Sequence, residues 1–86
     1  MKGLFETLLK DVGKDFDGTI AIKYCDNVDS AFFVIIEARQ RRGDKTYSII
    51  KSITKKEIAS TTHLEPFLKD ILEHVIKDVK ELRYIF

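Results

Sequence analysis

The sequence has a single cysteine, a single proline and no tryptophan, and only four of its 86 residues are glycine. One cysteine cannot form an internal disulfide, so we expect the chain to work in a reducing compartment, the cytoplasm. With so little proline and glycine and no repeated or serine-rich stretch, residues 1–86 are expected to form one small domain. No apolar run approaches the roughly 18 residues that a membrane span requires, and no signal-peptide core is present, so no membrane association is expected.

Neither sign of charge dominates the chain. Fifteen Lys and Arg against fourteen Asp and Glu leave a formal net charge of +1, and apolar residues make up 44% of the sequence. This balance excludes a disordered polyelectrolyte and a chain held to nucleic acid by bulk charge alone. A domain of this size buries roughly 60–65% of its unfolded surface, which suffices for a modestly stable core.

Two stretches have the periodicity of amphipathic helices. In residues 3–14 apolar side chains recur at spacings of three and four, and Gly13 acts as a stop signal near the end. From Leu64 to Leu82 the same spacing continues for about five turns. Residues 82–86, Leu-Arg-Tyr-Ile-Phe, add further apolar side chains and are expected to pack as a last helical turn, with contact to a partner as the alternative.

The start of the C-terminal helix has two alternatives. Thr62 and Glu65 have the spacing of a capping box. Pro66 as the first helical residue is the other choice, because proline is favoured at that position. Residues 54–57, Thr-Lys-Lys-Glu, form a second capping-box candidate that opens a short turn before the main helix.

Between the helices the apolar period changes to two, which is typical of strands. We expect strands at residues 19–25, 31–40 and 45–53, separated by turn-forming residues at 26–30 and 41–44. Connections this short require antiparallel neighbours. The expected fold class is therefore α+β: a three-stranded antiparallel meander with an N-terminal helix and a long C-terminal helix, in the order α-β-β-β-α, with the helices mainly on one face.

The register follows from the apolar pattern. A turn centred on residues 42–43 pairs Ile36 with Ile49, and the first hairpin pairs Tyr24 with Phe32. This register collects nearly every large apolar strand residue on one face, and a slip of one residue would scatter them over both faces. The residues expected in the core are Ile22, Val34, Ile36 and Ile49 beneath Leu68, Ile71, Leu72 and Val75.

Little in the sequence indicates catalysis. His63 and His74 are eleven residues apart and do not form a metal-binding pair. Asp70, His74 and Asp78 line one helix flank, which we interpret as solvated because no nucleophile accompanies them. Cys25 is interpreted as a structural cysteine. No phosphate loop, nucleophile motif or metal framework is present, so we expect no enzyme activity, catalytic residue, metal, cofactor or small-molecule substrate.

The charges are unevenly distributed along the chain. Residues 39–56 contain seven basic residues against Asp44, a local charge of +6, and residues 11–29 contain five acidic against two basic residues, −3. We therefore expect a basic hairpin tip that binds an anionic partner, with an acidic edge at the opposite turn. Reversing Arg41 and Arg42 to Glu is expected to leave the fold intact and to weaken partner binding. The alternative is a tip that is only a solvated turn, for which the reversal leaves binding unchanged. The candidate residues for an anionic partner are Arg39, Arg41, Arg42, Lys45, Lys55 and Lys56.

The second face of the sheet is the other candidate site. In the expected register Phe33, Ile35 and Ile50 form an apolar patch on it, with Ala21 beside them. If both helices cover the first face, this patch is open, and open apolar patches mark interaction surfaces. If one helix crosses over, the patch is core instead. The first hypothesis is therefore a non-enzymatic protein-binding module that self-associates as a homodimer through this face.

Two resemblances concern the order of elements. The helix–strand–strand–strand–helix order resembles double-stranded-RNA-binding domains, and residues 54–59, Thr-Lys-Lys-Glu-Ile-Ala, resemble the lysine-bearing start of that family's second helix. In that family the lysine pair binds phosphates across the groove. The resemblance implies, as the alternative function, a nucleic-acid-binding domain that uses residues 39–56. Size and element order also resemble small phage or mobile-element proteins, which implies an inhibitor or adaptor of a host protein.

Overall fold

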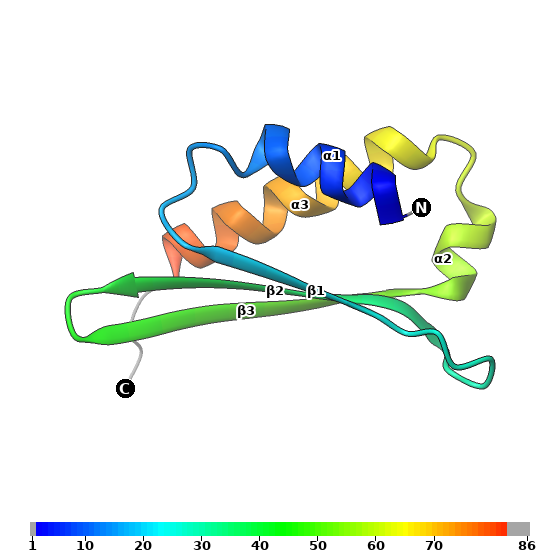
Figure 1. The fold of residues 1–86 in the computed structure, drawn as a ribbon, viewed down its shortest axis with the longest axis horizontal. Coiled ribbons are helices and arrows are strands. Elements are labelled where there is room, and N and C mark those ends of the chain that lie inside the picture. The colour runs from blue at the N-terminus through cyan, green and yellow to red at the C-terminus, as the bar shows by residue number, and fades with distance from the viewer. Residues whose placement is uncertain (1, 83–86) are drawn as a thin grey trace.

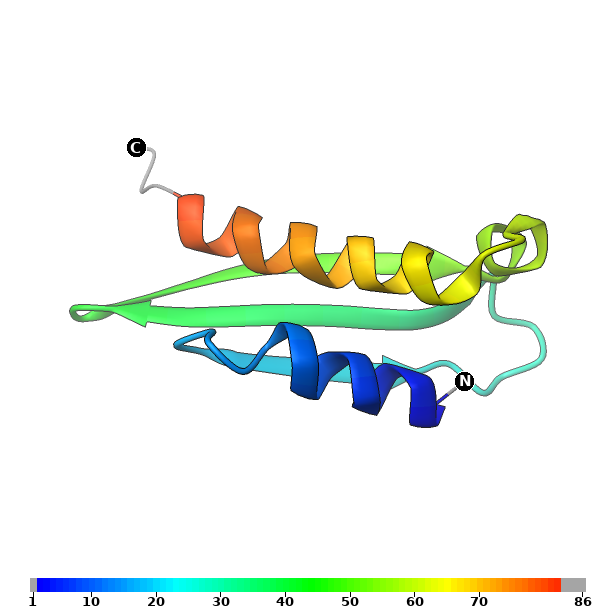
Figure 2. The ribbon, with the colours of Figure 1, turned by 90° about the horizontal axis from the view of Figure 1, so that it is seen from above.

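The computed structural model describes residues 2–82. Its elements are α1 (Lys2–Val12), β1 (Thr19–Tyr24), β2 (Phe32–Arg42), β3 (Lys45–Thr54), α2 (Lys55–Ser60) and α3 (Leu64–Glu81). The strands form one antiparallel sheet in the order β1-β2-β3. Helices α1 and α3 lie side by side on one face, and α2 lies at the end of the sheet (Figures 1 and 2). The predicted α+β meander with a long C-terminal helix is confirmed. Of the last helical turn predicted at residues 82–86, Leu82 is the C-cap of α3 with an extended backbone, and residues 83–86 lie outside the described residues.

The core lies between the two long helices and the covered face of the sheet. Its buried residues are Phe5, Leu8, Val34, Ile36, Ala38, Ile53, Leu68, Ile71, Leu72, Val75, Ile76 and Val79. Ile22 and Ile49, also predicted in the core, pack against it but are half-buried, because they lie on the outer strands. The ring of Tyr24 meets Phe5 edge-on with centroids 6.1 Å apart, and burial, followed by the charge of Glu6, raises the pKa of Tyr24.

The predicted register is wrong by two residues in both hairpins. Ile49 pairs with Ala38 rather than Ile36, and the first hairpin is displaced in the same way. The second turn consists of residues 43–44, with Gly43 at φ 67° as the only positive φ among the described residues. A two-residue loop with positive φ at its first position alone is a type II′ turn, which matches the strand twist. Moving the turn by one residue shifts partners by two, so each side chain keeps its face.

A β-bulge at the start of β2 changes which side of the sheet Phe32 and Phe33 face. Phe32 pairs with Thr54 and Val34 with Ile53, so Phe33 is an extra residue with no opposite partner. An extra residue interrupts the alternation of side chains. Phe33 consequently packs against the core cluster, and Phe32 is 41% exposed. The prediction that placed Phe33 on the second face is corrected by this bulge.

The capping box predicted at residues 54–57 is confirmed at the start of α2. The Thr54 hydroxyl accepts the Glu57 N–H at 3.1 Å, and a Glu57 carboxylate oxygen accepts the Thr54 N–H at 3.2 Å. The hydrogen bond from the Thr54 backbone, and then the one from its side chain, lower the pKa of Glu57 because they stabilise the charged carboxylate.

Neither predicted start of α3 is correct. The helix begins at Leu64 with His63 as its N-cap, and the His63 side chain makes no capping hydrogen bond. Pro66 is therefore the third helical residue, not the first, and Thr62 lies outside the helix. The first turn tolerates proline because the N–H groups there have no intrahelical acceptor, so the missing donor forfeits no helical bond.

Candidate protein-binding surface

The face of the sheet turned away from α1 and α3 is covered by no helix in residues 2–82 (Figure 1). We call it the open face. Side-chain alternation and the observed register place on it Thr19, Ala21, Lys23, Ile35, Glu37, Arg39, Arg41, Thr46, Ser48, Ile50 and Ser52. Ile50 is 65% exposed. The open face is thus mostly polar, with a small apolar area.

The apolar area is less continuous than predicted. Glu37 pairs with Ala21 on β1 and with Ile50 on β3, so its carboxylate side chain stands between them. Ile35 is diagonal to Ile50, at the distance of about 7–8 Å over which long side chains still touch. Ile35 and Ile50 therefore form the centre of the area, and Ala21 lies at its margin.

Phe32 is the residue that sequence reasoning missed. It pairs with Thr54, which lies two residues beyond Ser52, the partner of Ile35. Phe32 therefore follows Ile35 on the same side of the sheet, where Phe33 was predicted. Nothing in two adjacent phenylalanines reveals which one a bulge will turn outward. We call the set Phe32, Ile35, Ile50 and Ala21 the open patch.

Arg42, predicted to bind an anionic partner, is used inside the fold. Its guanidinium donates hydrogen bonds to the main-chain oxygens of Lys80 at 3.2 Å, Val79 at 3.3 Å and Leu82. It also stacks over the Tyr47 ring, 3.9 Å from the centroid. These carbonyls at the end of α3 carry the negative end of the helix dipole, which a cation stabilises. Arg42 therefore fastens the hairpin to α3.

Lys55 is also engaged within the fold. Its ammonium donates to the main-chain oxygens of Asn27 at 2.9 Å and Val28 at 3.2 Å, which ties the loop after β1 to α2. Lys45 and Lys56 lie at opposite ends of the sheet, next to the second turn and in α2 (Figure 1). The structure thus does not bring the six candidate basic residues together.

Arg39 and Arg41 do share the open face, but Asp17 accompanies them. A groove of about 260 Å³ is lined by Asp17, Gly18, Thr19, Arg39, Arg41 and Thr46. A Cβ at Gly18 would lie 2.3 Å from the Arg39 carbonyl oxygen, so only glycine allows the chain to pass this close. The segment before β1, which contains Asp17, therefore lies at the hairpin end of the sheet, and the loop at residues 25–31, which contains Asp26 and Asp29, lies at the other end (Figure 1). The predicted separation into a basic and an acidic end is wrong.

A second groove lies between β3 and α3, and we call it the β3 groove. It has a volume of about 290 Å³ and is lined by Ile49, Lys51, Asp70, Ile71, His74, Val75 and Asp78. His74 Nδ1 lies 2.8 Å from the Asp70 main-chain oxygen and 3.3 Å from its carboxylate. No hydroxyl or thiol nucleophile lines this groove, and residues 2–82 contain no cluster able to hold a metal ion.

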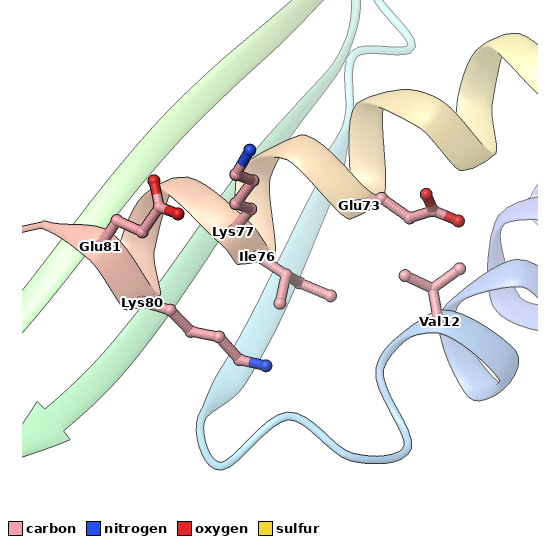
Figure 3. Close-up of a pocket in the computed structure, with 6 residues that line it drawn as sticks. All are labelled: Val12, Glu73, Ile76, Lys77, Lys80 and Glu81. Carbon is pink, nitrogen blue, oxygen red and sulfur yellow. The ribbon is translucent and has the colours of Figure 1, made fainter.

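A third groove, also of about 290 Å³, separates the end of α1 from α3 (Figure 3). Val12 and Ile76 point toward one another, with Glu73 and Lys80 at their sides, and Lys77 and Glu81 complete the lining. An apolar floor with charges of both signs is what two packed amphipathic helices leave at their junction.

Cys25, just after β1, is half-buried and not in a disulfide, and its N–H donates to the Phe33 carbonyl at 3.0 Å. None of the helices in the described part of the chain is long and apolar enough to cross a bilayer. Comparison of the chain with protein-family models, with curated proteins and with solved structures finds no match, so the open face and the grooves are what argue for a function.

Proposed function

We propose that this protein is a non-enzymatic protein-binding module and that the open face of its sheet is the binding surface. The observation that carries the proposal is the exposure of Ile50 at 65% and Phe32 at 41% on the face without a helix. Apolar side chains within a polar surround are typical of protein interfaces. An aromatic residue such as Phe32 is the usual anchor of such a contact.

The charges around the open patch favour an acidic partner. Lys23, Arg39 and Arg41 share the face, and Glu37, which pairs with Arg39 at 3.0 Å, is the only acidic residue on the strands of that face. Two copies stacked face to face would bring like charges together, whereas an acidic segment of another protein complements them. We therefore place an acidic protein before a face-to-face homodimer. An adaptor or inhibitor acting in the reducing cytoplasm, of the phage type that the element order resembles, would use such a surface.

The test is capture of a binding protein from lysate by the immobilised chain, with and without nuclease, followed by affinity measurement on the purified partner. We expect Ile35→Asp to abolish binding, because a charge buried without a partner at an interface destabilises the complex by several kcal/mol. The matched control is Thr62→Asp, which adds the same charge at an exposed loop position on the helix side. Circular dichroism should show both variants folded.

Three results would contradict the proposal. One is equal affinity of the wild type and Ile35→Asp for the captured protein. Another is capture that disappears with nuclease, combined with heparin retention that falls steeply with salt, which would favour the nucleic-acid alternative. The third is an unfolded Ile35→Asp variant, which would make position 35 part of the core. Arg42 and Lys55, two of the six basic residues on which the nucleic-acid alternative depends, already bind main-chain oxygens, so the protein-binding function is preferred.

A further inference from the structure

The outer edge of β3 is suited to pairing with another strand. β3 pairs with β2 on one side, and no strand of residues 2–82 pairs with it on the other. It is ten residues long and contains neither proline nor glycine, and the bulge lies in β2. The opposite edge, β1, has six residues. Long regular edges with unpaired backbone groups are where strands from other chains add to a sheet.

A strand added at this edge would meet different chemistry on its two sides. On the helix side it would lie beside the β3 groove, where Asp70 and Asp78 outnumber Lys51. Basic side chains would fit there. On the open face it would lie beside Ile50, which is 65% exposed, so an apolar side chain would fit. The edge therefore selects a strand that alternates basic and apolar residues.

β3 itself meets both requirements at one point along its length, where Lys51 faces the helix side and the adjacent Ile50 faces the open face. Toward the helix side it presents Lys45, Tyr47, Ile49 and Lys51, and toward the open face Thr46, Ser48, Ile50 and Ser52. We propose that β3 pairs antiparallel with β3 of a second copy of this chain, about a two-fold axis beside Ile50. In this register Ile50 opposes its own counterpart, and Lys51 opposes Ile49. Each Lys51 thereby reaches the acidic residues of the other copy's β3 groove.

The pairing has a consequence for the whole assembly. A two-fold axis perpendicular to the sheet joins the two sheets into one of six strands and keeps both open faces on the same side. The two open patches then meet at Ile50. This dimer concerns the strand edge and stands apart from the proposed function, because it forms whether or not the open face binds another protein.

A charge exchange tests the proposed dimer. Lys51→Glu puts a carboxylate against Asp70 and Asp78 of the other copy, and the double variant Asp70→Lys/Asp78→Lys puts two cations against Lys51. We expect each variant alone to raise the dimer Kd about tenfold or more, measured by sedimentation at low salt. A one-to-one mixture should recover dimers, because each groove then receives a charge of opposite sign. Lys69→Glu, exposed on α3 outside the groove, is the matched control and should leave the Kd unchanged.

Hydrogen exchange identifies the surface directly. In the proposed dimer, amides of β3 that point away from β2 become protected as the protein concentration rises. A monomeric wild type at millimolar concentration would overturn the inference. So would a dimer that survives Lys51→Glu and is lost in Ile35→Asp, because it would be a face-to-face dimer. The two proposals can fail separately. If Ile35→Asp still forms the edge dimer and still captures the partner as well as the wild type does, only the proposed function is contradicted.

Discussion

The two faces of the sheet are built from the same three strands, yet they have opposite roles in the fold. On the covered face Val34, Ile36 and Ile53 are completely buried beneath α1 and α3. On the open face the neighbouring positions carry Glu37, Arg39 and small hydroxyl residues, and Ile50 is largely exposed. Burial against the helices supplies the stability, so residues of the open face do not have to be apolar and closely packed. Substitutions on one face should change folding, and on the other binding.

The sharpest test of this contrast uses adjacent residues of β2. Ile36→Ala should lower the free energy of unfolding by about 2–5 kcal/mol, because it opens a cavity among residues that cannot close around it. Ile35 lies on the open face and is half-buried, so Ile35→Ala should lower the free energy of unfolding by about 1 kcal/mol or less. Urea denaturation of both variants measures the difference. Equal losses would mean that the open face is also core.

A second pair of adjacent residues separates an arginine that binds the end of α3 from an exposed arginine that donates only to the Gly43 carbonyl of its own turn, at 3.1 Å. Arg42→Ala should destabilise the protein by about 1.5–3 kcal/mol, since hydrogen bonds from a charged group to the end of α3 are lost. Arg41→Ala should stay within about 0.5 kcal/mol of the wild type. From the sequence alone, charge reversal at both arginines is expected to leave the fold intact, and thermal unfolding decides between that expectation and the contacts of Arg42. If both variants lose less than about 0.5 kcal/mol, the hydrogen bonds of Arg42 to α3 do not contribute to stability.

The bulge in β2 is tested by the two phenylalanines that it distinguishes. Phe33→Ala should lower the unfolding free energy by about 1 kcal/mol more than Phe32→Ala, because Phe33 packs against the core and Phe32 is partly exposed. Partner binding should show the reverse order, with the larger loss for Phe32→Ala. If the two stability losses are exchanged, the bulge is misplaced and Phe33 belongs to the open patch.

The smallest expected effect concerns the capping box of α2. The Glu57 pKa is lowered in the folded protein, so its hydrogen bonds with Thr54 stabilise the fold above the ordinary glutamate pKa of about 4.3 and are lost as the pH falls through the lowered value. Glu57→Gln should therefore be less stable than the wild type at neutral pH, with the gap narrowing in acid. Unfolding midpoints at a series of pH values measure the stability difference between the two proteins. A difference that does not change with pH would show that the charge of Glu57 does not contribute to stability.

Local sequence signals predicted much of the fold. The apolar period of two placed Ile22, Ile36 and Ile49 on the same side, and that assignment holds even though the register is displaced, because an error of two residues preserves the face. The capping box at Thr54 and Glu57 was equally readable, since its two hydrogen bonds join residues only three apart.

The candidate sites were less predictable, because their residues are placed by partners distant in the chain. Nothing near Arg42 in sequence indicates that it will meet the end of α3, 37 to 40 residues away. Lys55 likewise meets a loop 27 to 28 residues before it. The position of Asp17 beside Arg41 depends on the close approach of Gly18 to β2. Counting charges along the chain therefore predicted a separation of basic and acidic ends that the fold does not have.

The sequence by itself determined the kind of domain, the number of strands and which side of each strand is apolar, because these depend on periodicity and on caps within a few residues. Only the tertiary structure decided which phenylalanine faces outward and which basic residues are engaged. Those outcomes depend on how α3 packs against the sheet and on one bulged residue in β2. Packing of this kind joins groups that local periodicity does not relate to one another.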